Sequence, residues 1–132
     1  MFEVSAKVDY GLLILVELMG QPNGTYLSLA DIASKHNVSP KYLSQVMIPL
    51  HRDGLVVSRE GKGGGYALAK PAEQISLRAV VEAIDGPLQL TRCMTTTASC
   101  PAEHGCSTKP VWHKVKKSIY QLLEEQTLAN VC

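Results

Sequence analysis

The segment from Ser28 to Ala69 constrains the fold of this chain more than any other, because it orders two helices and a hairpin in one short span. A helix is expected to begin at Ser28, since serine accepts hydrogen bonds from the free backbone N–H groups of a first helical turn. Asp31 places a negative charge in that turn, where the helix dipole favours it. A second helix is expected to begin at Ser39-Pro40, an N-cap residue followed by proline at the first helical position.

This second helix has an apolar side and a polar side. Its apolar residues recur at spacings of three, four and seven, which marks an inward face; they are Leu43, Val46, Met47 and Leu50. The residues on its other faces are polar: Lys41, Ser44, Gln45 and His51. Asp53-Gly54 ends the helix. Two short helices joined by a short turn, the second polar outside, form a helix-turn-helix pattern.

A β-hairpin is expected directly after these helices. Residues 55–58 and 66–69 have the pattern of two short strands, and the glycine-rich, basic stretch 59–65 joins them. A phosphate-binding glycine loop is excluded because such loops open a helix, whereas a strand follows here. The order predicts a fold that is mainly α with a small β-hairpin wing: a winged helix-turn-helix.

Three further helices complete the prediction. One runs from about Ser5, its N-cap, to Met19, and another begins at Ser76 and ends at Asp85-Gly86-Pro87. A long helix from Val111 to about residue 126 has a narrow apolar stripe that either covers the core or pairs with another helix; its members are Trp112, Val115, Ile119, Leu122 and Leu123. We expect this helix to form a homodimer. The expected domains are 1–87 (DNA-binding), 88–110 (cysteine-rich loop) and 111–132 (dimerisation helix and tail).

The distribution of charge favours a nucleic-acid partner. The net charge is only +1, but the segment 35–70 has a local excess of four positive charges, with six Lys or Arg against two Asp or Glu. Such a segment can neutralise phosphates. The alternative, a winged helix used for protein contacts, is disfavoured by this excess. No run of 18 apolar residues exists, so no membrane-spanning helix is expected, and without an export signal a cytoplasmic location is expected.

The expected contacts with double-stranded DNA follow from the way a recognition helix enters the major groove, N-terminal end first. Gln45 can pair with adenine, Lys41 with guanine or phosphate, and Arg52 with phosphate. In the wing, basic side chains stand beside glycines that permit close approach to the minor groove. The full expected set is Ser39, Pro40, Lys41, Tyr42, Ser44, Gln45, Arg52, Arg59, Lys62 and Gly63.

Three of the four cysteines lie within fourteen residues, as Cys93, Cys100 and Cys106. In a reducing cytoplasm, clustered cysteines are more often metal ligands or redox sensors than disulfides. Their spacing is too loose for a zinc knuckle, and thiolates on one loop can converge on a multi-iron cluster. Spacing alone leaves an iron–sulfur cluster, zinc and metal-free redox cysteines open. An enzyme is not expected, because no third group orients a cysteine–histidine pair.

The whole chain resembles the IscR/NsrR-type regulators of the Rrf2 family. The matching segments are Asp9-Tyr10-Gly11-Leu12, Val38-Ser39-Pro40-Lys41-Tyr42-Leu43, Gly54-Leu55-Val56, Gly63-Gly64-Gly65-Tyr66 with Leu68 and Lys70-Pro71, the three-cysteine loop, and Thr127-Leu128-Ala129. The resemblance implies a dimeric, sequence-specific DNA-binding regulator, here expected to be a repressor. It also implies a 2Fe–2S or 4Fe–4S cluster held by the three cysteines as a sensor of redox state, nitric oxide or cluster supply. The alternative is a cluster-free regulator that uses these cysteines as thiol sensors or zinc ligands.

The fourth cluster ligand is where this chain departs from part of the family. One branch has a histidine three residues after the last cysteine, and here that position is Lys109. Another branch uses an aspartate of the first helix, supplied by the partner subunit, and Asp9 matches it. Asp9 is therefore the leading candidate, followed by His104 and Glu103. The plainer interpretation of Asp9 is a carboxylate with a structural partner near a helix end. A change at the cluster is expected to alter the placement of the two DNA-reading heads.

Overall fold

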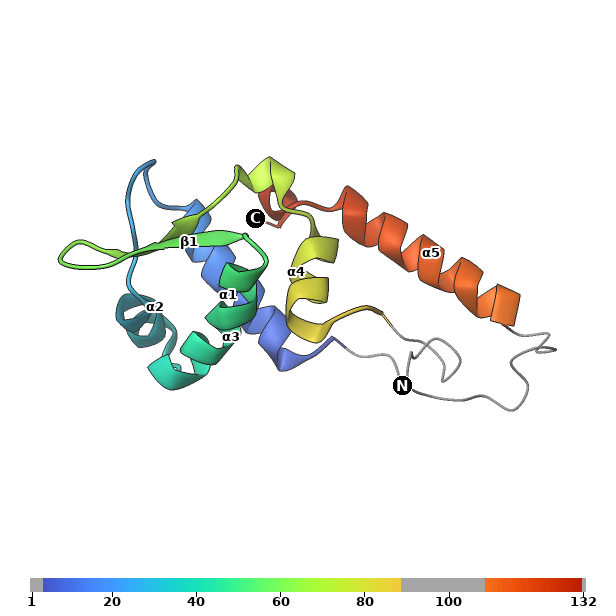
Figure 1. Ribbon diagram of the computed structural model, residues 1–132, viewed down its shortest axis with the longest axis horizontal. Helices are drawn as coiled ribbons and strands as arrows, with labels where there is room; N and C mark the ends of the chain where they lie inside the picture. The colour runs from blue at the N-terminus through green and yellow to red at the C-terminus, as the bar shows by residue number, and fades with distance from the viewer. Residues whose placement is uncertain (1–3, 89–108, 132) are drawn as a thin grey trace.

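The structure is a computed structural model that describes residues 4–88 and 109–131 of the chain. In chain order the elements are α1 (Ala6–Met19), α2 (Leu29–His36), α3 (Pro40–Arg52), β1 (Val56–Arg59), β2 (Gly65–Leu68), the 3-10 turn η1 (Ala72–Gln74), α4 (Leu77–Asp85), α5 (Lys109–Glu125) and the 3-10 turn η3 (Leu128–Asn130). Helices α1, α2, α3 and the hairpin form one end of the molecule, and α5 extends from the other (Figure 1). This confirms the predicted fold class. No described helix is long and apolar enough to cross a membrane.

Serine side chains cap the start of each of the first four α-helices. In each case the hydroxyl accepts a hydrogen bond from the backbone N–H three residues later, and the caps are Ser5, Ser28, Ser39 and Ser76. The four predicted helix starts are therefore confirmed. A cap of this kind typically contributes about 1 kcal/mol, because it satisfies an N–H group that has no partner within the helix.

The wing is a two-stranded antiparallel hairpin with Val56 opposite Leu68 and Arg59 opposite Gly65. Each strand is displaced by one residue from the prediction. The reason at the first strand is that the Leu55 N–H donates to the Leu50 carbonyl at 3.0 Å and so closes the turn after α3. The sequence did not predict a third segment of the sheet: Leu27 pairs with Tyr66 through two backbone hydrogen bonds of 2.9 Å.

Gly65 makes this third pairing possible. Its φ is +138°, and a Cβ at this position would collide with the backbone of Leu27 and lie 2.8 Å from the amide nitrogen of Ser28. Only glycine allows the two backbones to approach so closely in this conformation. The two Leu27–Tyr66 hydrogen bonds therefore hold the wing against the segment that leads into α2.

The core lies between α1, α3 and α4 and is closed by the C-terminal tail. Its buried members include Ile14, Leu43, Leu50 and Val80, and Leu128 of η3 joins the same cluster with 1% of its surface exposed. The Leu128 N–H donates to the Ile75 carbonyl at 2.8 Å, and the Leu77 N–H donates to the Gln126 carbonyl at 2.9 Å. The tail therefore returns to the core, near η1 and the start of α4 (Figure 1).

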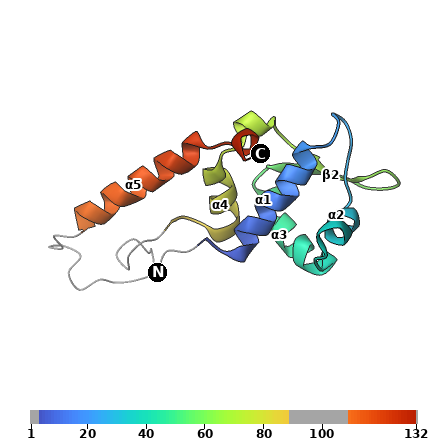
Figure 2. The ribbon, with the colours of Figure 1, turned by 180° about the vertical axis from the view of Figure 1, so that it is seen from behind.

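Helix α5 begins two residues before the predicted Val111 and runs obliquely past α4 in both views (Figures 1 and 2). Arg78 of α4 joins the two helices. Its guanidinium pairs with Glu82 at 2.9 Å and with Glu124 of α5 at 3.6 Å, and lies 4.3 Å from the ring centre of Tyr120. The Tyr120 hydroxyl also accepts a hydrogen bond from the Leu88 N–H at 2.6 Å. Much of the predicted stripe nevertheless faces solvent, with Leu122 62% exposed and Trp112 39% exposed.

Candidate nucleic-acid interface

The turn between α2 and α3 sets the direction of the second helix. Asn37 ends α2 in the left-handed conformation, with φ of 55°, and its N–H bonds to the last carbonyls of α2. The Val38 N–H then donates to the Ala33 carbonyl at 2.9 Å. This arrangement reverses the chain within a few residues, because a left-handed residue redirects the backbone while it satisfies free carbonyl groups. The Ser39 cap then starts α3 immediately.

The two sides of α3 separate as the sequence predicts. Leu43, Val46, Met47 and Leu50 are buried against the core. The outward side carries the exposed residues Pro40, Lys41, Ser44, Gln45 and His51. It also carries Ile48, which the sequence interpretation did not include and which is 62% exposed. The position of Ile48 around the helix axis, away from the buried residues, could have predicted this exposure from the sequence.

Two predicted contact residues have structural roles at the start of α3. The Ser39 hydroxyl is used by the cap, where it accepts from the Tyr42 N–H at 3.5 Å. The half-buried Tyr42 ring packs edge-on against the ring of Tyr10, with centres 5.2 Å apart. An edge-to-face aromatic pair of this kind adds to the area the rings bury, so Tyr42 holds α3 against α1.

Arg52 links α3 to α4. Its Nη2 donates to the Ala83 carbonyl at 2.9 Å, and its Nε pairs with Asp53 at 3.0 Å. Its side chain is nonetheless 63% exposed. Arg52 therefore already joins α3 to the last turn of α4, and its exposed side chain could contact a phosphate in addition.

The wing presents the remaining predicted residues. Arg59, Lys62 and Gly63 are exposed, and the Arg59 guanidinium lies 5.6 Å from the ring centre of Tyr26. The tip is closed by a hydrogen bond of 3.0 Å from the Gly64 N–H to the Gly61 carbonyl. A Cβ on Gly64 would collide with the Arg59 carbonyl, so a side chain is excluded at that point.

A hollow of about 310 Å³ lies between α3 and the wing. Its lining residues come from both elements: Ser44, Met47, Ile48, His51, Arg52, Ser58 and Tyr66. Nε2 of His51 lies 3.3 Å from the Ser58 hydroxyl, and the His51 ring stands edge-on to Tyr66. These contacts fix the spacing between the recognition helix and the first strand of the wing.

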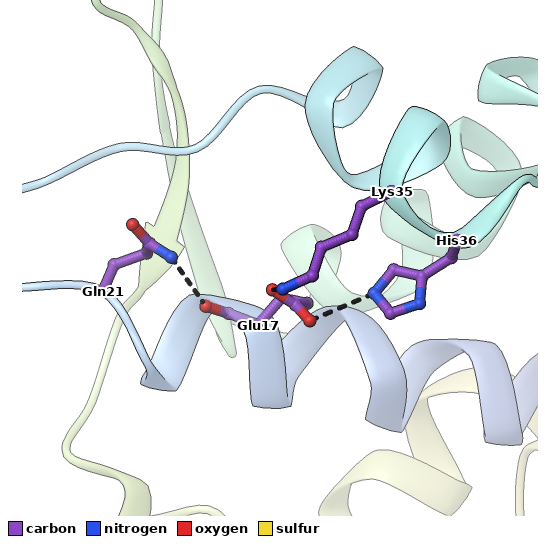
Figure 3. A network of polar contacts seen from close by, with 4 residues as sticks. All are labelled: Glu17, Gln21, Lys35 and His36. Atoms are coloured by element: carbon purple, nitrogen blue, oxygen red, sulfur yellow. Dashed lines mark hydrogen bonds and ion pairs between the residues drawn. The ribbon is translucent and has the colours of Figure 1, made fainter.

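Not all of the positive charge counted in the sequence is available to a ligand. Figure 3 shows Lys35 and His36 of α2 converging on Glu17 of α1, with N···O distances of 3.0 and 3.1 Å. The hydrogen bond from Lys35 is the main reason that the pKa of Glu17 lies below its ordinary value, and His36 adds to it against the opposing effect of burial. Among the described residues, Lys41, Arg59 and Lys62 form no ion pair. Within residues 35–70, α3 and the wing therefore keep three cations without an ion pair, and Lys70 after the wing is a fourth.

The predicted metal ligands divide between described and undescribed residues. Cys93, Cys100, Cys106 and His104 lie outside the described residues. Asp9 is exposed on the first turn of α1, and it borders an apolar groove with Leu13, Val16 and Val131. No hydrogen bond or ion pair from its carboxylate to another described residue is present, and 4–88 with 109–131 contain no cluster of three metal-ligating side chains. Within the part of the chain that the structure describes, the carboxylate of Asp9 is thus exposed and has no partner.

Residues 4–132 match the Rrf2 family, described as iron-dependent transcriptional regulators. The chain belongs to this family. It is 31% identical to the HTH-type transcriptional regulator IscR of Yersinia pseudotuberculosis over 97% of this chain and 77% of the relative. It is a DNA-binding winged-helix transcriptional regulator and not an enzyme.

Solved structures of Rrf2 regulators have the same fold. The T. potens IscR superimposes with a TM-score of 0.74 and 32% identity, over 98% of this chain and 85% of that one. CymR, described as the global cysteine regulator of B. subtilis, superimposes with a TM-score of 0.77 and 29% identity, over 99% of this chain and 96% of that one.

Proposed function

We propose that this Rrf2 regulator is a cytoplasmic, homodimeric, sequence-specific repressor whose DNA affinity is set by an iron–sulfur cluster held by Cys93, Cys100 and Cys106. The observation that carries the DNA-binding part is the outward side of α3, where Lys41, Ser44 and Gln45 stand exposed beside a basic wing. Lys41 and Gln45 have the chemistry to contact base edges, and Arg59 and Lys62 the chemistry to contact phosphates.

The dimer is supported by the apolar side of α5. Val111, Trp112, Val115 and Leu122 expose between 37% and 62% of their surfaces on one helix. A helix with an apolar stripe is stable in water when that stripe meets another apolar surface. In a dimer, two α5 helices would also bring two winged helices to a fixed separation, which matches operators made of two half-sites.

The cluster is supported by the donor set. When bound, an iron–sulfur cluster supplies a group that reacts with oxidants and nitric oxide. Three thiolates account for three ligand positions, and Asp9 of the partner subunit is the proposed fourth ligand, because its side chain is exposed on the first turn of α1 and forms no ion pair with a described residue. His104 is the second choice for that position.

A chain of contacts connects the segment that carries the cysteines to the DNA-reading helix. That segment follows Leu88, whose N–H is held by Tyr120 of α5, and α4 lies directly before it. Arg52 fastens the last turn of α4 to the end of α3 through the Ala83 carbonyl. Arg52 is thus one of the contacts through which a shift of α4 would reach α3.

The deciding experiment is an anaerobic purification with visible absorption and analysis of iron, sulfide and zinc. We expect iron with matching sulfide, loss of both in Cys93→Ser, and full retention in Cys132→Ser, the matched control. A colourless protein with zinc or without metal would contradict the cluster. It would favour the second candidate, a thiol-based regulator, which the similarity to CymR makes worth testing.

DNA reading is tested with a duplex selected by the protein from a random pool and with a scrambled copy. Gln45→Ala is expected to lose about tenfold or more in affinity for the selected duplex and little for the scrambled one, because a bidentate base contact discriminates between bases. Gln121→Ala on α5 is the matched control. Titrations at one fixed salt concentration are required, since phosphate contacts make affinity salt-dependent. Equal losses on both duplexes would contradict base reading by Gln45.

A further inference from the structure

Ile48 stands at the centre of the DNA-facing side of α3. At about 100° per residue, Ile48 lies about 20° from Lys41 around the helix axis, between Ser44 and Gln45. Leu50, which is buried, lies about 160° away. Ile48 thus lies on the same side of α3 as the polar contact residues and on the opposite side from Leu50. Its exposure therefore follows from its position on the helix.

The surroundings of Ile48 add apolar surface to a polar face. Ile48 is 62% exposed and borders the hollow between α3 and the wing, together with Met47 and the ring of Tyr66. Ser44 lies one turn earlier and His51 about one turn later. More than half of the surface of Ile48 is open to solvent, and its side chain has no hydrogen-bonding group to contribute at a DNA surface.

One feature of the major groove suits such a side chain. Thymine presents a C5-methyl group there, and none of the other three bases carries a methyl group at that edge. We propose that Ile48 is a specificity-determining residue that packs against the C5-methyl group of a thymine in the operator. This inference rests on the proposed DNA-reading function and specifies one base within it. The polar neighbours fix the register of α3, and Ile48 selects for thymine at the step it faces.

The test removes one methyl group at a time from the DNA. Full-length protein first selects a duplex from a random pool, and each thymine of one half-site is then replaced by deoxyuridine, which differs only by that methyl group. Affinities are measured by fluorescence anisotropy at fixed salt. The variants are Ile48→Ala, Ile48→Val, and Val57→Ala as the matched control. Val57 is also an exposed apolar residue, but it points to the opposite face of the hairpin from Ser58, which faces α3.

We expect one or two positions at which deoxyuridine weakens wild-type binding about fourfold, which corresponds to about 0.8 kcal/mol for one buried methyl group. Ile48→Ala should bind the thymine duplex about as weakly as wild type binds the uridine duplex, and it should not respond to the replacement. In a double-mutant cycle the two losses are therefore not additive. Ile48→Val should retain most of the response, and Val57→Ala all of it.

Each contrary outcome overturns a different statement. If wild type enriches no sequence, the proposed DNA-reading function fails and the inference fails with it. If a sequence is enriched but no position responds to uridine, or if Ile48→Ala responds as wild type does, only the inference fails. A loss of the dimer in Ile48→Ala, measured by sedimentation, with unchanged DNA affinity per dimer would show that Ile48 contacts protein instead. Because Ile48 is exposed, an unchanged melting temperature in the variant is expected and separates these outcomes from misfolding.

Discussion

Helices α3 and α5 are both amphipathic, but among the described residues only α3 has its apolar side covered. The core-facing residues Leu43, Val46, Met47 and Leu50 of α3 are all buried, and its exposed side is mostly polar apart from Ile48. Helix α5 has 17 residues and exposes four large apolar side chains, among them Trp112 and Leu122. Amphipathicity alone therefore does not show which surface a helix will cover. The buried side of α3 belongs to the core, and the exposed stripe of α5 is the surface that we propose for self-association.

The largest effect is expected when a buried side chain of α3 is truncated. Leu50→Ala should lower the free energy of unfolding by about 3 kcal/mol, because Leu50 is fully buried and the cavity cannot collapse. Leu122→Ala should change the unfolding of the monomer by less than about 0.5 kcal/mol, because Leu122 is 62% exposed. Urea titrations of both variants at one low protein concentration make the comparison. Similar losses in the two variants would contradict the difference between α3 and α5.

The next largest effect is expected at the exposed apolar stripe of α5. Leu122→Asp should weaken self-association about a hundredfold or more, because a charge would be buried at the seam without a partner. Sedimentation velocity over a range of concentrations measures this, with Gln121→Asp as the control on a neighbouring position of the same helix. If Leu122→Asp remains a dimer, the exposed stripe of α5 is not the seam.

The sequence reveals α3 more completely than α5 for a physical reason. A cap forms between residues that are close in the sequence. Ser39 and Ser76 therefore indicate where their helices begin without any information about the tertiary structure. Leu27 and Tyr66 are far apart in the sequence and form a single bridge. A single long-range pair of this kind produces no periodic pattern in the sequence. The same holds for Leu128 in the core and for the bond from Arg52 to Ala83. Such contacts depend on how finished elements approach one another.

The candidate site shows the same limit. Exposure of Lys41, Ser44 and Gln45 follows from helical periodicity, and Ile48 follows from it as well once its phase is considered. The charge count overestimated the free positive charge, because the partner of Lys35 is Glu17, eighteen residues earlier. The roles of Cys93, Cys100 and Cys106 stay predictions, because they lie outside the described residues.

A smaller effect is expected at the start of α3. Ser39→Ala should lower the free energy of unfolding by about 1 kcal/mol, since the Tyr42 N–H loses its acceptor. Ser118→Ala on the exposed part of α5 is the control and should be neutral or slightly stabilising, because alanine favours a helix interior. Thermal unfolding followed by circular dichroism measures both. Equal changes in the two variants would mean that the cap at Ser39 contributes nothing.

The smallest effect is expected where α2 is fastened to α1. Glu17→Gln should lower the free energy of unfolding by about 0.5 kcal/mol near neutral pH, because the ion pair with Lys35 is lost and Lys35 is largely exposed. The pKa of Glu17 is lower in the folded protein than its ordinary 4.5. Its stabilisation is therefore complete above pH 4.5 and disappears as the pH falls through the folded value.

Unfolding curves of wild type and Glu17→Gln at several pH values test this sign. The difference between them should be present near neutral pH and should shrink as the pH falls below 4.5. Glu73→Gln, at an exposed position, is the control. A difference that continues to grow as the pH falls below 4.5 would contradict the assigned ion pair.

The burial of Leu128 has a consequence for the order in which this protein matures on the ribosome. Because synthesis proceeds from the N-terminus, α1 to α4 emerge well before the residue that completes their core. The DNA-reading end can reach its final stability only after the whole of α5 has also been made. A chain cut short before Leu128 would thus lack the last core residue, and one cut short before α5 would also lack the surface proposed for self-association. Incomplete copies would not accumulate as stable single heads that compete for operators.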